Sequence, residues 1–149
     1  MRVYRASSLG YSLEALVAPH LGFEPIDPPE WLQNAFDQGS ALEPKIIERL
    51  KIYGMDLTDS QLEVELEVIP GVAKVVGHLD GMHNDCVVEI KTMNPKTWKE
   101  VVAQGWDKAG GLIEKYRWQA SAYMLATRKP IQFVGYNKET EELAYSSYG

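Results

Sequence analysis

The stretch Gly77-His78-Leu79-Asp80-Gly81, followed by Val87-Val88-Glu89-Ile90-Lys91, decides how the middle of the chain folds. Each part is short and mostly apolar, and turn-forming residues lie between the two, which predicts a β-hairpin. Side chains on one face of a hairpin alternate along each strand. Asp80, Glu89 and Lys91 are therefore expected on the same face of two neighbouring strands.

The register of this hairpin depends on its loop. A loop over residues 82–85 places Asp80 opposite Val87, so that Asp80 and Glu89 are diagonal neighbours about 7–8 Å apart at the backbone. His78 then lies on the same face, opposite Glu89. It could be an extra ligand or a phosphate contact, but a hydrogen-bonded structural histidine is the favoured interpretation.

The three charged side chains share a half-buried face with apolar neighbours. Two like charges there cost several kcal/mol unless something neutralises them. Carboxylate oxygens suit Mg²⁺ or Mn²⁺, and Lys91 could then orient or help deprotonate a water. The alternative is that Lys91 forms a salt bridge with Glu89 or Asp80, and strand parity alone leaves both interpretations open.

The flanking patterns predict an α+β fold, a mixed sheet of about five strands with helices packed on it. Apolar and acidic residues alternate over 62–68, as in a strand with one buried face. A helical stripe runs from Glu30 to about Tyr53, with a kink or a new start near Ser40. Further helices are predicted over 7–24 (a short helix and a turn), 98–104 and 112–127, and a last hairpin over 131–136 and 142–148.

The chain of 149 residues, 45% hydrophobic and 24% charged, is the size and composition of one globular domain. We expect an N-terminal helix and turn extension over 1–29 and a core over 30–149. The sequence has no apolar run of the roughly 20 residues that a membrane span needs. A single cysteine, Cys86, excludes an internal disulfide and an iron–sulfur cage, and the start does not resemble a signal peptide, so we expect a cytoplasmic protein.

The net charge of −6 is unevenly distributed. Residues 1–95 carry 7 Lys or Arg against 15 Asp or Glu, a net charge of −8, whereas residues 96–129 carry 7 against 3, a net charge of +4. An acidic body with one basic segment is compatible with a polyanionic ligand but does not require one.

Two further motifs accompany the charged hairpin. Glu43 ends the sequence Gly39-Ser40-Ala41-Leu42-Glu43 on the helix before the strands, and Gln119-Ala120-Ser121-Ala122-Tyr123 lies on the helix after them. Taken alone, Ser-x-x-Glu could be only a helix capping box. Gln119 and Tyr123, one turn apart, could be only a helix surface that packs on the sheet.

Together, in this order, these motifs resemble the PD-(D/E)XK nuclease superfamily and its RecB-like branch, which includes lambda-type phage exonucleases. Asp80 matches the first acid, Glu89-Ile90-Lys91 the Glu-x-Lys signature, and Glu43 the acid on the preceding helix. The resemblance spans roughly residues 39–136. It implies a restriction-endonuclease-like core. It also implies that Gln119 and Tyr123 orient the acid–lysine face or contact DNA.

The resemblance implies a metal-dependent DNA nuclease, more specifically an exonuclease of recombination, repair or phage DNA processing. Asp80, Glu89, Glu43 and the carbonyl of Ile90 would hold one or two Mg²⁺ or Mn²⁺ ions, with no iron–sulfur cluster. Lys91 would position the attacking water, and the product would carry a 5′-phosphate. The substrate would be linear duplex or single-stranded DNA, with a second copy of the chain or a recombination protein as a possible partner and no role for a membrane.

The basic segment offers candidate DNA contacts. Lys115 and Arg117 could grip the phosphate backbone, an interaction without sequence preference. Aromatic residues lie between these cations and could stack on unpaired bases. We expect Trp118 to be buried and Trp106 to be the better stacking candidate.

Two other functions compete with a nuclease. A catalytically silent DNA-binding module could keep the same fold, although it would have no reason to keep a costly charged cluster. A structural domain could instead use Asp80, Lys91 and Glu89 as a salt-bridge network, in which case a divalent metal would not raise the melting temperature.

Overall fold

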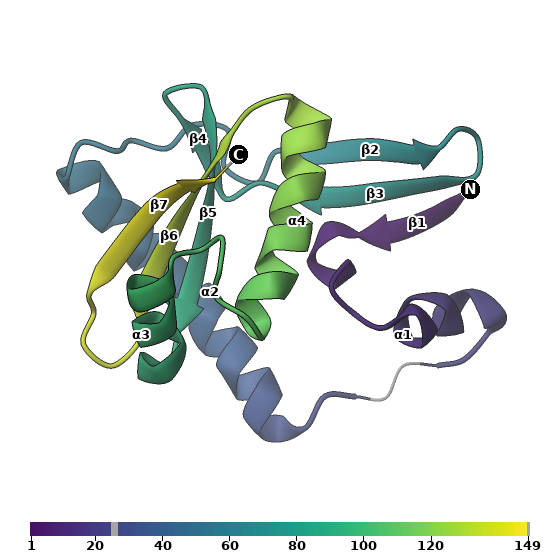
Figure 1. Ribbon diagram of the computed structural model, residues 1–149, viewed down its shortest axis with the longest axis horizontal. Coiled ribbons are helices and arrows are strands. Elements are labelled where there is room, and N and C mark those ends of the chain that lie inside the picture. The colour runs from purple at the N-terminus through teal and green to yellow at the C-terminus, as the bar shows by residue number, and fades with distance from the viewer. Residues whose placement is uncertain (25–26, 149) are drawn as a thin grey trace.

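The computed structural model describes residues 1–24 and 27–148 and confirms the α+β class (Figure 1). The strands divide over two mixed sheets instead of a single sheet of about five strands. The strands are β1 (Arg2–Arg5), β2 (Glu63–Ile69), β3 (Ala73–His78), β4 (Gly81–His83), β5 (Cys86–Met93), β6 (Ile131–Asn137) and β7 (Leu143–Tyr148). The helices are α1 (Leu13–Val17), α2 (Glu30–Ile52), α3 (Pro95–Gln104) and α4 (Leu112–Thr127), with the short 3-10 turns η1 (Ala6–Ser8) and η2 (Ala18–Leu21).

The smaller sheet has the strand order β1-β3-β2. β2 and β3 are antiparallel, and the glutamates of β2 are solvent-exposed, as its alternating sequence predicted. β1 runs parallel to β3 and was not expected, because four residues carry too little pattern to mark a strand. The N-terminal segment therefore contributes a strand as well as a short helix and turn.

The larger sheet has the order β4-β5-β6-β7, in which β5 and β6 are parallel and the outer pairs antiparallel. A parallel pair needs a long crossover connection, and α3 and α4 supply it between β5 and β6. The β6–β7 hairpin matches the predicted one within a residue at each end. β5 is thus a central strand with a neighbour on each side.

The β4–β5 hairpin turns over two residues, Asn84 and Asp85, so the expected loop over 82–85 is wrong. Both residues have positive φ, 48° and 62°, which suits the tight turns that follow the twist of a hairpin. Gly81 pairs with Val88, and continuing this register places Asp80 opposite Glu89 instead of Val87. A shift of two residues leaves the face unchanged, so the predicted side of the sheet was correct and the spacing was not.

Helix α2 is continuous from Glu30 to Ile52, so no new start occurs near Ser40. Pro44 lies inside it and has no backbone N–H to donate. The C-terminal half of α2 is anchored by the buried side chains of Ile46 and Leu50, whereas no residue before Ile46 is fully buried.

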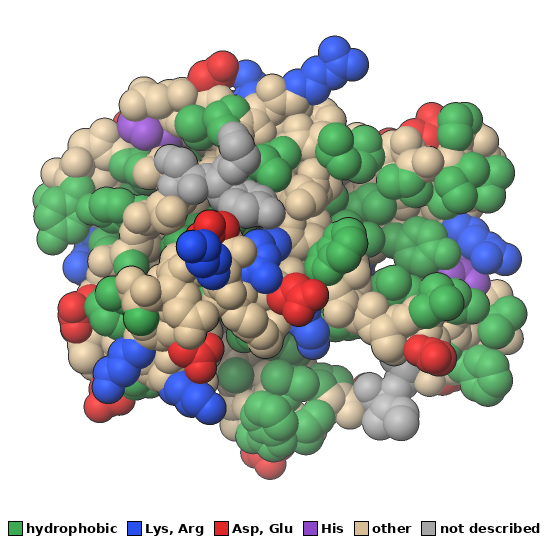
Figure 2. Space-filling model, viewed as in Figure 1, with side chains coloured by type: hydrophobic (Ala, Val, Ile, Leu, Met, Phe, Trp, Pro, Cys, Tyr) green, Lys and Arg blue, Asp and Glu red, His purple; other side chains and the backbone are tan. Residues whose placement is uncertain are grey.

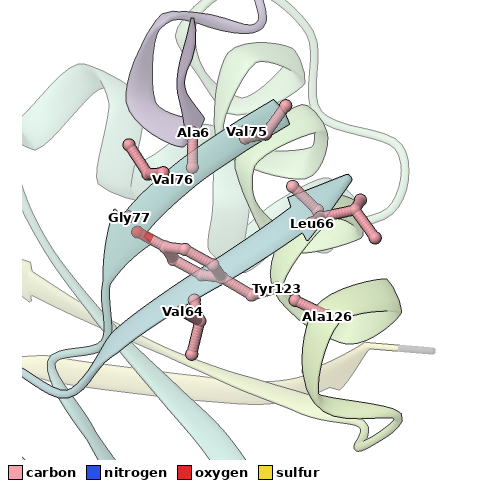
Figure 3. A pocket seen from close by; sticks show the side chains of 9 residues that line it. Ala6, Val64, Leu66, Val75, Val76, Gly77, Tyr123 and Ala126 are labelled. Atoms are coloured by element: carbon pink, nitrogen blue, oxygen red, sulfur yellow. The ribbon is translucent and has the colours of Figure 1, made fainter. Parts of the chain in front are cut away.

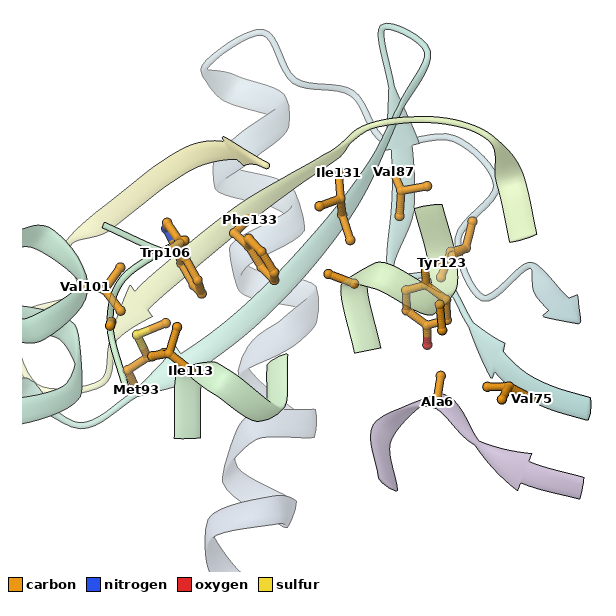
Figure 4. Packing of buried hydrophobic residues seen from close by; sticks show 14 residues of the cluster. Ala6, Val75, Val87, Met93, Val101, Trp106, Ile113, Tyr123, Ile131 and Phe133 are labelled. Atoms are coloured by element: carbon orange, nitrogen blue, oxygen red, sulfur yellow. The ribbon is translucent and has the colours of Figure 1, made fainter. Parts of the chain in front are cut away.

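Two apolar clusters cover the two faces of the larger sheet. On one face, Ile46 and Leu50 of α2 pack against residues of β5 and β6, namely Val88, Ile90, Val134 and Tyr136. On the other face, α3, α4 and the loop between them pack against Val87, Met93, Ile131 and Phe133 (Figure 4). Helix α4 lies between the two sheets and contacts both (Figure 1). No helix of the described residues is long and apolar enough to cross a membrane.

Candidate active site

Asp80 occupies the corner between the two sheets, in the two-residue link between β3 and β4. Its Oδ2 atom accepts a hydrogen bond of 2.7 Å from the backbone N–H of Ile90. This bond ties the acid to the central strand β5 and fixes its side chain at the level of Glu89. The next residue, Gly81, begins β4 and is buried against Leu57. A Cβ at this position would lie 2.8 Å from Cβ of Leu57, so the close contact needs a glycine.

Glu89 and Lys91 extend from β5 toward helix α4. The Glu89 side chain is 3% exposed, and its Oε2 lies 3.5 Å from Nζ of Lys91. Its other oxygen, Oε1, is buried with no hydrogen-bond partner among the described residues. A buried carboxyl with one unpaired oxygen is uncommon in a folded protein and is costly to maintain.

Glu43 approaches the same cluster from α2. Its Oε1 accepts a hydrogen bond of 3.5 Å from Nε2 of Gln61, a residue just before β2. Burial raises the pKa of Glu43 to about 7, and the negative charge of Asp80 adds to the rise, while Lys91 opposes it. The two acids are therefore electrostatic neighbours although 37 positions separate them (80 − 43).

The other two acids respond to burial in the same way. Burial raises the pKa of Glu89 to about 8, with a further contribution from the charge of Asp80 and an opposing one from Lys91. Burial also raises the pKa of Asp80, against the hydrogen bond from Ile90 and the charge of Lys91. Three carboxyl groups around one ammonium thus do not all ionise easily near neutral pH, which is typical of functional sites.

A short hydrogen-bonded chain on α4 supports Lys91. Oε1 of Gln119 accepts a bond of 2.7 Å from Nζ of Lys91, and Nε2 of Gln119 donates to the hydroxyl of Tyr123 at 3.3 Å. That hydroxyl in turn donates to the backbone carbonyl of His78 at 3.2 Å. Gln119 and Tyr123, predicted to share a helix face, do so and point at the sheet.

Gly77 makes room for this chain. A Cβ at Gly77 would lie 2.6 Å from both Cε1 and the hydroxyl oxygen of Tyr123. Figure 3 shows the Tyr123 ring lying across Gly77, with Ala6 and Val76 beside it. The packing here leaves no room for a water molecule. The missing side chain at Gly77 is thus what allows Tyr123 to reach the carbonyl of His78.

The chemistry of this cluster fits a divalent cation, although the cage expected from the sequence is not preformed. Within residues 1–24 and 27–148, no three Asp, Glu, His or Cys side chains are already gathered around one point as ligands. The unpaired Oε1 of Glu89 and the raised pKa values of Glu43 and Glu89 are nevertheless what a set of carboxylate ligands shows without its ion.

A cleft of about 440 Å³ opens beside the cluster. Gln119 and Tyr123 form one side of it, and Arg5 and Ser7 of the N-terminal segment contribute polar groups. The exposed side chain of His78 also lines the cleft. His78 pairs with Glu63 of β2 and does not lie opposite Glu89, so its expected position was wrong.

The aromatic predictions are reversed. Trp106 is 2% exposed and stacks on Phe133, with ring centroids 4.4 Å apart, so it is not available to stack on a base. Trp118 is 55% exposed, on the outer face of α4, and its expected burial was wrong. Trp106 is drawn into the core because its loop is closed by Arg117, whose guanidinium donates to the carbonyls of Trp106 and Ala109 at 2.9 and 2.5 Å.

The two predicted phosphate contacts, Lys115 and Arg117, differ in whether their charged groups are free to meet DNA. The half-buried guanidinium of Arg117 donates its hydrogen bonds to backbone carbonyls of the loop before α4. Lys115 is exposed, with Nζ 5.2 Å from the centroid of the Tyr11 ring, and its role as a DNA contact stays a prediction. The face in Figure 2 carries acidic and basic side chains side by side and has no continuous basic surface.

The sequence reasoning missed one contact of the charged cluster. Nζ of Lys91 lies 4.6 Å from the centroid of the Tyr116 ring. Tyr116 precedes Gln119 by three positions, so both lie on the same face of α4. That spacing was visible in the sequence, but which face of α4 meets β5 was not.

Comparisons with known proteins reveal structural but no sequence relatives. No protein-family model matches the chain, and no curated protein matches it in sequence. An alkaline exonuclease (LHK-Exo) from Laribacter hongkongensis is similar in structure, with a TM-score of 0.65, 21% identity and coverage of 96% of this chain and 75% of that one. LHK-Exo in complex with dAMP gives a TM-score of 0.60, 18% identity and coverage of 97% and 76%.

A third structure, of a protein designated SSO0001, matches with a TM-score of 0.62, 17% identity and coverage of 100% of this chain and 68% of that one. At these identities the likeness concerns the fold. The chain therefore shares the fold of LHK-Exo, an alkaline exonuclease, and its sequence motifs resemble the PD-(D/E)XK superfamily.

Proposed function

We propose that this protein is a metal-dependent nuclease that hydrolyses phosphodiester bonds of DNA. The observation that carries the proposal is the convergence of Asp80, Glu89 and Glu43 around the ammonium of Lys91. The fold supports it, because LHK-Exo, of which two structures are similar to this chain, is an alkaline exonuclease by name. The ion pair with Lys91 uses only Oε2 of Glu89, and the buried Oε1, which has no hydrogen-bond partner among the described residues, is free to accept a cation.

Asp80, Glu89, Glu43 and the carbonyl of Ile90 would hold Mg²⁺ or Mn²⁺. A bound ion would supply the positive charge that activates a water and polarises the phosphate. Lys91 orients the attacking water and offsets negative charge on the phosphate as the water oxygen bonds to phosphorus. The bond to the 3′ oxygen then breaks, which gives a 3′-hydroxyl and a 5′-phosphate. Gln119 keeps the ammonium of Lys91 in place through its 2.7 Å hydrogen bond.

The cleft beside the cluster supports an exonuclease. Its volume of about 440 Å³ is in the range of small-molecule sites and would accommodate one nucleotide next to the reacting phosphate. The neighbouring LHK-Exo structure is a complex with dAMP, a nucleotide of that size. We infer that the terminal nucleotide of linear DNA occupies this cleft.

Digestion of end-labelled linear DNA and of closed circular DNA, side by side, tests the proposal. Linear DNA should be degraded with Mg²⁺ or Mn²⁺ and remain intact in excess EDTA, and circular DNA should remain intact throughout. Lys91→Ala should reduce the cleavage rate at least about 100-fold, whereas Lys96→Ala, an exposed lysine on α3, should leave it unchanged. Full activity in EDTA or in the Lys91 variant would contradict the mechanism. Cleavage of circles would contradict the exonuclease assignment alone.

A further inference from the structure

Lys91 is held by three groups, and only two of them belong to the sequence motifs. Gln119 accepts its hydrogen bond at 2.7 Å, and Glu89 lies 3.5 Å away. The third is the ring of Tyr116, whose centroid is 4.6 Å from Nζ. This distance is within the range of a cation–π interaction, in which the negative face of an aromatic ring attracts an ammonium.

The environment of Tyr116 keeps the ring in a fixed place. Tyr116 is half-buried and packs against the apolar cluster between α4 and the larger sheet. Burial raises the pKa of its hydroxyl to about 12, so the side chain is uncharged near neutral pH. Because the ring carries no net charge, it attracts the ammonium without neutralising it.

We propose that Tyr116 is a positioning residue that holds the Lys91 ammonium over its ring, beside the Gln119 hydrogen bond and the Glu89 contact. This inference rests on the proposed nuclease function. Without the ring, one side of the ammonium would lose its contact, and the Lys91 side chain could turn away from the position in which it meets a substrate phosphate. Tyr116 and Gln119, on one face of α4, thus together fix the orientation of the Lys91 side chain.

The role assigned to Tyr116 requires the ring and not the hydroxyl. Tyr116→Phe should therefore keep kcat within about twofold of the wild type, since phenylalanine offers the same face to the cation. Tyr116→Leu should lower kcat about tenfold while KM stays within about twofold, because the substrate is still bound. Leu125→Ala, at an exposed apolar residue of the same helix, is the control and should leave both constants unchanged.

A double-mutant cycle on thermal unfolding supplies a readout that does not depend on activity. Lys91→Met, Tyr116→Leu and the double variant are compared with the wild type without metal. The loss in Tm caused by Tyr116→Leu should be smaller in the Lys91→Met background, because the ring no longer has a cation to hold. Equal losses in both backgrounds, or a Tyr116→Phe variant as slow as Tyr116→Leu, would overturn the inference.

The two proposals fail in different ways. If the wild type cleaves no DNA with any divalent metal, the nuclease function is wrong, and the Tm cycle still reports whether the ring and the ammonium interact. If the wild type cleaves and Tyr116→Leu retains the wild-type kcat, the nuclease function stands and the positioning role is wrong.

Discussion

The two faces of strand β5 are built from the same backbone and carry opposite chemistry. Toward α2, Val88 and Ile90 join a cluster in which every buried side chain is apolar except for the Tyr136 hydroxyl. Toward α4, Glu89 and Lys91 interrupt the apolar residues Val87 and Met93. The apolar side chains of the first face need no polar partner, whereas the second face holds Oε1 of Glu89, which is buried without a hydrogen-bond partner among residues 1–24 and 27–148. The first face therefore contributes stability, and the second gives up part of it to keep a buried charged cluster.

The largest effect on stability is expected on the α2 face. Ile46 is fully buried against β5 and β6, and Ile46→Ala should lower the free energy of unfolding by about 4 kcal/mol through lost burial and the cavity left behind. Chemical denaturation measures this loss. Ile52→Ala, exposed on the same helix, is the control. A small effect of Ile46→Ala would show that the α2 face is less tightly packed than described here.

The α4 face should instead respond to pH. The pKa of Glu89 is raised to about 8 in the folded protein, so the folded state holds a proton that the unfolded state has released. Its contribution is present below the unfolded pKa of about 4.5 and is lost as the pH rises through about 8. The metal-free protein should therefore lose stability of the order of 3 kcal/mol between pH 5 and 9.

Thermal unfolding in EDTA across that pH range measures the loss. Glu89→Gln should make the profile less steep, with the remaining slope coming from Glu43, whose pKa is also raised, while Glu63→Gln, on the exposed face of β2, should leave the profile unchanged. Added Mg²⁺ or Mn²⁺ should raise the Tm most at high pH, where Glu89 is ionised. A Tm that is insensitive to metal at all pH values would favour the salt-bridge network over a metal site.

A smaller effect on stability is expected at Gly77, the residue of β3 against which Tyr123 of α4 packs. A methyl group there collides with Tyr123, so Gly77→Ala should destabilise the protein by about 1–3 kcal/mol and displace the hydroxyl that supports Gln119. Its kcat should fall together with the Tm. Gly110→Ala is the matched control, because a Cβ at Gly110 would meet no atom within 4 Å. An unchanged kcat in Gly77→Ala would separate Tyr123 from the reactive site.

Local sequence patterns predicted the elements that depend on local interactions. The helix predicted after the Gly110-Gly111 loop matches both ends of α4, and the Asn94 cap and Pro95 mark the start of α3 three residues earlier than its expected beginning at Trp98. Strand parity correctly placed Asp80, Glu89 and Lys91 on one side. β1 was not predicted, because only its pairing with β3, 71 positions along the chain, makes it a strand.

The parts of the site that could not be predicted depend on tertiary contacts. The burial of Trp106 follows from its stacking on Phe133 and from the loop carbonyls that Arg117 holds, none of which leaves a periodic signal. The spacing of Gln119 and Tyr123 showed that they share a face, but not that the face meets Lys91. The register of the hairpin was missed because the positive φ of Asn84 and Asp85 was not considered, although Asn and Asp tolerate it well.

The tight bend at Asn84 and Asp85 has a consequence for how changes in its length would affect the protein. It lies on the exposed tip of the β4–β5 ribbon, outside the reactive cluster, yet its length determines where Asp80 stands. One inserted residue that shifted the register of β4 on β5 by one position would turn Asp80 onto the apolar face that packs against α2. Two inserted residues would return Asp80 to its own face, but two positions away from Glu89. The length of this exposed turn thus sets the position of a half-buried aspartate relative to the neighbouring strand.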